Sequence, residues 1–275
     1  TVIQDDINNQ IKISATPAEA GSRSVELIVE IPQTDVKVKL TIIQSKYYKV
    51  GDLYVVNGEP LGLVYEISDG GAHGKVVALK AHRDLNLWYR TGLPYDEIHP
   101  EDPNNVGVIA RSETDGQENM KAYKQIPDWK THYPVAAYVS DLNDENGNPG
   151  WYLPAIKEVQ AMVGWIDGEV LSPDGEAGQE PSEAMKEKRK AINQLIVDNG
   201  GNEFYFYGYD VSFIIDQTNA WEADYFNRIY TSTETDYQVH PMVFKFYLRN
   251  GWWETMHVYG DLAGSYGEVR PFLAF

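Results

Sequence analysis

The chain has 275 residues, 43% of them hydrophobic and 12% aromatic, so it can bury a sizeable core as one large domain or two smaller ones. Its 41 acidic and 23 basic residues give a formal net charge of −18, and no basic run is present. This charge excludes nucleic acid and anionic membrane surfaces from the expected partners. The absence of cysteine excludes disulfides, thiolate metal sites and cysteine nucleophiles.

No apolar run reaches the roughly 18 residues that a transmembrane helix needs. The first residues, "TVIQDDINNQ", lack the charged and apolar pattern of a signal peptide. A secreted precursor whose signal was removed before Thr1 would look the same. The composition therefore permits a secreted protein and does not establish one.

Residues 1–46 alternate between apolar and polar side chains in the manner of β-strands. Three strands are predicted, in "QIKISATPA", "SVELIVEIP" and "VKVKLTIIQ", with turn clusters between them. Three strands make an incomplete sandwich, so this segment either packs on the rest of the chain or is completed by strands upstream in a longer precursor. We predict an N-terminal β segment over residues 1–46 and a larger unit over residues 47–275.

The larger unit begins with strands and continues with helices. "YVVNGEPLGLVYEI" and "GKVVALK" are predicted strands, and Asn57-Gly58 is a turn inside the first. One helix is expected from Thr114, which has capping-box spacing to Gln117. A second helix is expected from Pro154, with Ile156, Val159 and Val163 on one face. A third is expected to begin at the cap Ser182 and to end at Gly200-Gly201, with Ile192, Leu195 and Ile196 on its apolar face.

Aromatic strand segments follow Gly201 and end in "EVRPFLAF". The order of strands, helices and strands predicts an α+β fold.

Several short motifs of the larger unit stand in a characteristic order. They are "NGEPLGLVYEI", "GAHGKVVAL", "DGQENM", "YPVAAY", "GWYLPAIKEVQAM", "INQLIVDNGG", "IYTSTE" and "VRPFLAF". Over Tyr54 to Phe275 this series resembles the Fibrobacter major paralogous domain of Bacteroidetes surface proteins. Residues Tyr230 to Glu234 read Tyr-Thr-Ser-Thr-Glu, where that family commonly has Trp-Ser-Ser-Thr-Glu.

The resemblance implies a fold similar to C-type lectins and formylglycine-generating enzymes, in which the first and last strands pair. It also implies a location outside the cell, at the surface or associated with the outer membrane. The strands before Lys46, ending "KLTIIQSK", resemble the end of a BACON-type or other immunoglobulin-like module. Formylglycine-generating relatives oxidise with active-site cysteines, which this chain lacks.

Two adjacent tryptophans, Trp252 and Trp253, follow an Asn250-Gly251 pair. Asn-Gly between alternating runs predicts a two-residue type I′ hairpin, in which Arg249 faces Trp252 and Leu248 faces Trp253. One face then carries Phe244, Phe246, Leu248 and Trp253, and the other carries Lys245, Tyr247, Arg249, Trp252 and Glu254. The first is the expected core face.

The second face has the composition of a sugar-binding surface. A pyranose ring can stack on Trp252 while charged neighbours bind its hydroxyls. The predicted ligand-binding residues are therefore Trp252, Arg249, Tyr247 and Glu254. Two alternatives remain open: Trp252 packs under an insertion loop, or it stacks with Arg249 as a cation–π pair.

The acidic segment Asp141 to Trp151, "DLNDENGNPGW", is rich in calcium-type ligands. It fails the EF-hand pattern, because Asn146 and Tyr152 stand where Gly and Glu are required. We interpret it as a solvated acidic turn, with a different kind of calcium loop as the alternative. The six histidines show no metal-ligand spacing, so no metal and no cofactor are expected.

No nucleophile motif is present, and Glu158 and Glu234 are interpreted as carboxylates that fix helix or loop backbone. His73, in "GAHGK", is interpreted as ordering a turn.

These observations predict a secreted, non-enzymatic binding or adhesion protein of the cell surface, with a glycan or a protein as its ligand. One alternative is a structural pilus or surface-assembly subunit, in which the N-terminal strands pair with a neighbouring chain. The other is a carboxylate-dependent glycoside hydrolase.

Overall fold

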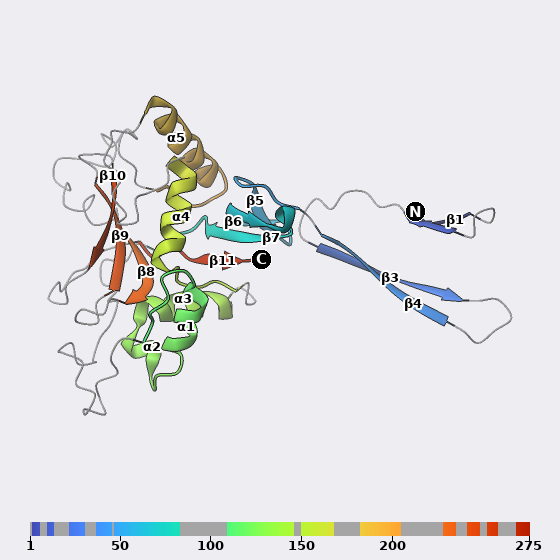
Figure 1. The fold of residues 1–275 in the computed structure, drawn as a ribbon, viewed down its shortest axis with the longest axis horizontal. Coiled ribbons are helices and arrows are strands. Elements are labelled where there is room, and N and C mark those ends of the chain that lie inside the picture. The colour runs from blue at the N-terminus through green and yellow to red at the C-terminus, as the bar shows by residue number, and fades with distance from the viewer. Residues whose placement is uncertain are drawn as a thin grey trace.

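The computed structural model describes residues 2–5, 10–13, 22–30, 37–45, 47–82, 109–145, 150–167, 182–204, 228–234, 241–247, 252–257 and 268–275. Four strands, and not the three expected, lie in the described part of the N-terminal segment. The strand β1 (Val2–Asp5), which was not predicted, pairs with β2 (Gln10–Ile13). The nine-residue strands β3 (Ser22–Glu30) and β4 (Lys37–Ser45) form a second antiparallel hairpin, which extends away from the helices (Figure 1).

A four-stranded antiparallel sheet begins the larger unit. It contains β5 (Leu53–Val56), β6 (Glu59–Ser68), β7 (His73–Ala78) and β11 (Phe272–Ala274), in the order β11-β7-β6-β5. The Asn57-Gly58 turn is confirmed, because Val56 pairs with Glu59 and the two turn residues have φ angles of 52° and 86°.

The first and last strands share this sheet but are not neighbours. Through the Asn57-Gly58 turn, β5 pairs with one edge of β6. The short 3-10 helix η1 (Asp69–Gly71) follows β6, and β7 then pairs with the other edge of β6. The free edge of β7 is then the place where β11 pairs, with Phe272 opposite Val77. The strands in "LGLVYEI" and "VRPFLAF" were expected to be neighbours, and this is corrected: β7 lies between them.

Five helices lie between the two groups of strands in the described part of the chain: α1 (Gly116–Tyr123), α2 (Trp129–His132), α3 (Pro134–Glu145), α4 (Ile156–Asp167) and α5 (Glu183–Asp198). The cap of α1 is Asp115, whose side chain accepts from the Glu118 amide, and not Thr114 as expected. The predicted cap of α5 is confirmed, since the Ser182 hydroxyl accepts from the Met185 amide.

Helix α3 corrects the interpretation of the acidic segment, because residues Asp141 to Glu145 are its last turn and not part of a loop. Its apolar positions Val135, Ala136 and Val139 are buried at helical spacing, which extends the helix into the acidic residues. None of the described helices is long and apolar enough to cross a membrane.

A second antiparallel sheet has the order β10-β9-β8, from β8 (Arg228–Glu234), β9 (Pro241–Tyr247) and β10 (Trp252–His257). Helix α4 packs against β6 of the first sheet and against β8 and β9 of the second. The expected face of α4 is confirmed, because Ile156, Val159 and Val163 are all buried.

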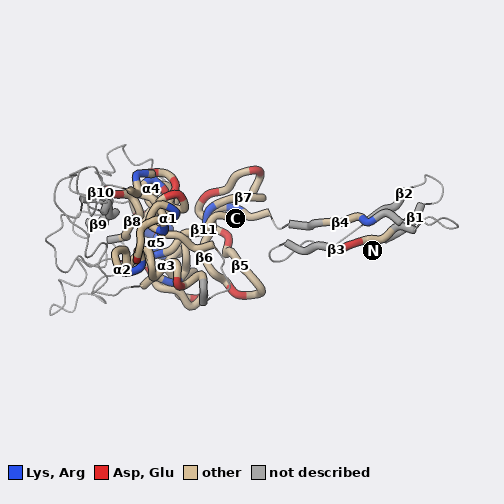
Figure 2. Tube along the Cα trace, turned by 90° about the horizontal axis from the view of Figure 1, so that it is seen from below, with Lys and Arg blue, Asp and Glu red and all other residues tan. Residues whose placement is uncertain are grey.

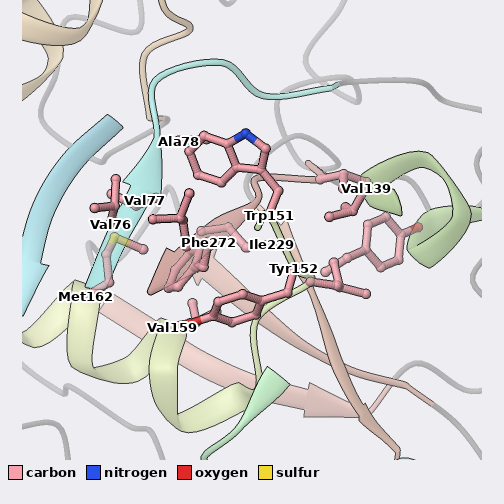
Figure 3. Close-up of a cluster of buried hydrophobic side chains, with 14 of the residues drawn as sticks. Val76, Val77, Ala78, Val139, Trp151, Tyr152, Val159, Met162, Ile229 and Phe272 are labelled. Atoms are coloured by element: carbon pink, nitrogen blue, oxygen red, sulfur yellow. The ribbon is translucent and has the colours of Figure 1, made fainter. Parts of the chain in front are cut away.

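The core lies where these elements meet. Figure 3 shows Val76 and Val77 of β7 beside Phe272 of β11, with Val159 and Met162 of α4 below them. Burial of this apolar surface is the main force that holds the sheets and α4 together. The described part of the chain is a mixed α+β structure.

Candidate functional site

Glu158, in the first turn of α4, is a buried carboxylate with four hydrogen-bond or ion-pair partners. Its Oε2 accepts from the backbone amides of Ala155 at 2.9 Å and Gly116 at 3.0 Å, so it joins the starts of α4 and α1. Its Oε1 accepts from the Tyr152 hydroxyl at 2.8 Å and lies 3.0 Å from the Lys75 ammonium. The side chain is only 3% exposed, so these bonds replace the water that a buried carboxylate would otherwise require.

The environment of Glu158 also acts on two tyrosines. Burial raises the pKa of the Tyr152 hydroxyl, and the negative charge of Glu158 raises it further. Burial, with Tyr152 and Glu158 as the next causes, raises the pKa of Tyr65 well above its usual value. Both hydroxyls therefore stay protonated at neutral pH.

Glu234, at the end of β8, has a similar role. Its Oε2 accepts from the backbone amides of Ile109 at 3.0 Å and Ala110 at 3.2 Å. Two neighbouring residues bind other segments: Thr233 Oγ1 accepts from the Ile156 amide, and Ser232 Oγ accepts from the Asn119 side chain. The Tyr-Thr-Ser-Thr-Glu motif thus fastens the segment before α1, helix α1 and the start of α4 to one strand.

These contacts confirm that Glu158 and Glu234 fix backbone. The Oε2 atom of each carboxylate accepts from two backbone N–H groups, which keeps the side chain in one orientation. A carboxylate that acts as general acid or nucleophile must instead face a substrate.

Sequence analysis missed a buried ion pair in the terminal "VRPFLAF" motif. Arg270, which is fully buried, pairs with Glu268 and donates to the carbonyls of Ala78 at 3.0 Å and Leu79 at 3.1 Å. It also donates to the Asn202 carbonyl at 2.7 Å, and its guanidinium stacks 4.0 Å from the Phe204 ring centroid. An arginine in the otherwise mostly apolar segment before β11 was the available signal.

The predicted aromatic site lies on β9 and β10, for which the structure describes the backbone. Trp252 pairs with Tyr247, and Trp253 pairs with Phe246. The predicted pairing of Trp252 with Arg249 is therefore wrong by two residues, and Arg249 itself lies outside the described residues. Strand β9 also pairs with β8 at its other edge.

A shift of two residues leaves the faces unchanged, because side chains alternate with a period of two. Trp253 shares a face with Phe244 and Phe246, and Phe244 pairs with Ile229, which is 3% exposed. Trp252 shares the other face with Lys245, Tyr247 and Glu254. The structure thus brings three of the four predicted site residues, Trp252, Tyr247 and Glu254, onto one face of the sheet.

The other flagged polar residues bind the protein itself. Asp141 pairs with Lys130 at 2.5 Å, and the side-chain Oδ1 of Asn143 accepts from the Trp151 backbone amide at 2.7 Å. His73 Nδ1 lies 3.2 Å from the Phe275 carbonyl oxygen, at the start of β7. Within the described ranges, no three His, Asp or Glu side chains gather in a group that could hold a metal ion.

Fold and contacts thus define a mixed α+β protein whose buried Glu158 and Glu234 side chains bind backbone amides. No family model, curated protein or solved structure matches the chain.

Proposed function

We propose that this chain is a secreted, cell-surface binding or adhesion protein that recognises a glycan without turnover, on a C-type-lectin-like scaffold. The observation that carries the proposal is the β9–β10 register. It puts one tryptophan, Trp253, on the face of buried Ile229 and its neighbour Trp252 on the face of Lys245, Tyr247 and Glu254. The motif resemblance to Bacteroidetes surface proteins supports the location and the scaffold.

The Trp252 face has the chemistry that a sugar requires. An indole ring offers a flat apolar surface to the C–H groups of a pyranose, and a tyrosine hydroxyl can bind a ring hydroxyl. Lysine and glutamate add charged hydrogen bonds, which are stronger than neutral ones. Lys245 and Glu254 are paired opposite each other, so the register brings both charges beside the aromatic pair of Trp252 and Tyr247.

A glycan array with the purified chain tests this proposal, followed by calorimetric titration of any sugar that binds. Trp252→Ala should abolish the binding heat, whereas Trp129→Ala, on helix α2, should leave it unchanged. Binding by Trp252→Ala as strong as that of the wild type would contradict the assignment of this face. If no glycan binds and a purified protein ligand does, the ligand of this chain would be a protein and not a glycan.

The glycoside hydrolase alternative receives less support. Glu158 and Glu234, the two carboxylates considered above as a possible acid pair, each already accept from two backbone amides. Incubation with an array-positive oligosaccharide, followed by mass spectrometry of the sugar, separates the two classes. Release of shortened products would favour the hydrolase, and an intact sugar favours a binding protein.

A surface-assembly subunit is the second candidate function. The observation that favours it is the β3–β4 hairpin, whose strands pair only with each other among the described strands. Each strand therefore has an outer edge that no described strand occupies, and such edges are templates for pairing between chains.

A further inference from the structure

The register of the β3–β4 hairpin separates its residues into two faces of different chemistry. Three consecutive rows of paired residues on one face are entirely apolar: Val25 with Ile42, Leu27 with Leu40, and Val29 with Val38. The other face is mixed: it holds Glu26, Glu30, Lys37 and Lys39 together with Ile28 and Ile43, and its Glu26 and Lys39 side chains form an ion pair at 2.6 Å. Figure 2 shows the acidic segment of β3 beside the basic segment of β4.

The apolar face is open to water in the isolated chain. Val25 is 50% exposed and Leu40 is 43% exposed, although each lies in the middle of a nine-residue strand. A two-stranded hairpin is marginally stable in water unless its apolar face is covered. The face therefore needs an occupant.

Charge favours this segment as the place where two copies meet. Residues 1–46 hold five basic and six acidic residues, whereas residues 47–275 hold 18 basic and 35 acidic residues. The larger unit is thus strongly anionic and repels a second copy, while the hairpin is close to neutral. The hairpin also extends away from the helices, which keeps the repelling parts apart (Figure 1).

The order of residue sizes makes the apolar face self-complementary. Leu27 and Leu40 form the central row, and β-branched residues form the row on each side. A two-fold axis through the central row would place the Val25/Ile42 row of one copy against the Val29/Val38 row of the other. An isologous contact needs such a patch, in which each residue meets a suitable partner on an identical surface.

We infer that the apolar face of the β3–β4 hairpin binds the same face of a second copy of this chain, giving a two-layer sandwich. The inference rests on the assembly candidate and is independent of glycan binding. Nine residues span about 30 Å, and two strands are about 10 Å wide, so each copy covers roughly 300 Å². Two such faces fall in the small interface class, so the dimer is reversible and depends on protein concentration.

Disulfide trapping tests the inference cleanly, because the chain has no cysteine of its own. Each of the two single variants, Leu27→Cys and Leu40→Cys, places one thiol on the central row, near the two-fold axis. Ile28→Cys is the matched control, since Ile28 adjoins Leu27, lies on the opposite face and is 64% exposed. Thr41→Cys reports on the competing geometry, in which the outer edges of two β4 strands pair antiparallel across Thr41.

Under mild oxidation of the full chain, Leu27→Cys or Leu40→Cys should form a covalent dimer roughly tenfold faster than Ile28→Cys, because thiols on outward faces cannot approach to bonding distance. The reduced wild type should show a concentration-dependent dimer in sedimentation velocity. Leu40→Lys should shift it to monomer, and Ile28→Lys should not.

Fastest cross-linking by Thr41→Cys would overturn the face-to-face geometry and retain assembly through strand edges. Equal rates for all the cysteine variants, or a wild type that stays monomeric at its highest soluble concentration, would overturn both the inference and the assembly candidate. A glycan array with either monomeric or dimeric protein is unaffected by these outcomes, since it reads the Trp252 face.

Discussion

The ring of Tyr48 packs edge-on against the ring of Phe275, with centroids 4.9 Å apart, although 227 positions separate the two residues. Tyr54 stacks on the same Phe275 ring at 5.2 Å. Backbone bonds fix both ends, because the Tyr48 amide donates to the Gly71 carbonyl and the Phe275 amide donates to the Gly74 carbonyl. The two ends of the larger unit therefore lie close together, beside the connection between β6 and β7.

This meeting point requires a glycine at position 71. Gly71 has a φ of +98°, and a Cβ added there would lie 2.1 Å from the Tyr48 carbonyl oxygen. Gly71→Ala should cost about 2 to 5 kcal/mol of unfolding free energy, since backbone strain and overpacking add. Gly70→Ala is the control: its φ is +70° with open space around the Cβ, so only the strain of about 1 kcal/mol applies. Urea denaturation of both variants checks this, and equal losses would contradict it.

The two tryptophans should differ in their effect on stability. Trp253→Ala should cost about 3 to 5 kcal/mol, the range for emptying a large aromatic from a core, because the register puts it on the face of Ile229. Trp252→Ala should change stability by no more than about 0.5 kcal/mol, as at a surface position. Thermal melts of the two variants provide the measurement. A larger loss in Trp252→Ala would reverse the face assignment and the site built on it.

Two glutamate–lysine ion pairs test whether burial or contact distance decides how much an ion pair stabilises the fold. Glu158→Gln should destabilise the fold by about 3 kcal/mol, because it removes a buried negative charge that pairs with Lys75, 27% exposed, and accepts from the buried Tyr152 hydroxyl. Glu113→Gln should cost less than about 1 kcal/mol, although the Glu113–Lys157 contact is shorter, 2.7 Å against 3.0 Å. Its side chains are both 51% exposed, and water screens such pairs. Chemical denaturation should rank the two variants in this order.

Tyr65 and Tyr152 are both buried, but only one hydroxyl has a hydrogen-bond partner within the described residues. The Tyr65 hydroxyl has none there, whereas the Tyr152 hydroxyl donates to Glu158 at 2.8 Å. Tyr65→Phe should therefore leave stability unchanged or raise it by about 1 kcal/mol, because a buried polar group is removed. Tyr152→Phe should cost about 1 to 3 kcal/mol through the lost bond to a charged acceptor. A large loss in Tyr65→Phe would show that its hydroxyl is bonded.

The raised pKa values of the same two tyrosines predict that the protein loses stability at alkaline pH. Burial raises the pKa of both hydroxyls in the folded state, whereas in the unfolded chain they titrate near 10. Below pH of about 10 both states keep the proton, so their contribution is complete. Above it the unfolded state loses protons that the folded state retains, so stability falls as the pH rises. Tyr65→Phe should make this fall shallower in denaturation series between about pH 9 and 11, and a slope equal to that of the wild type would contradict the burial effect.

Local features of the fold were predictable from the sequence because their causes lie within a few residues. Asn57 and Gly58 adopt positive φ and close a two-residue turn between β5 and β6. Ser182 caps α5 through the amide three positions on, and the spacing of Val159 and Val163 fixes the buried face of α4. Each signal acts through backbone sterics or helical periodicity, which neighbouring residues determine.

The tertiary structure decided what depends on distant partners. A second Asn-Gly pair, at 250–251, did not give the predicted pairing, because Trp252 pairs with Tyr247 and not with Arg249. The place of β9 between β10 and β8, where Phe244 meets Ile229, is likewise a contact between distant segments. The bonds of Glu234 to the amides of Ile109 and Ala110 span 125 and 124 positions. Only assembly of the sheets and helices brings such groups together, since burial forces each carboxylate to find donors that no local pattern reveals.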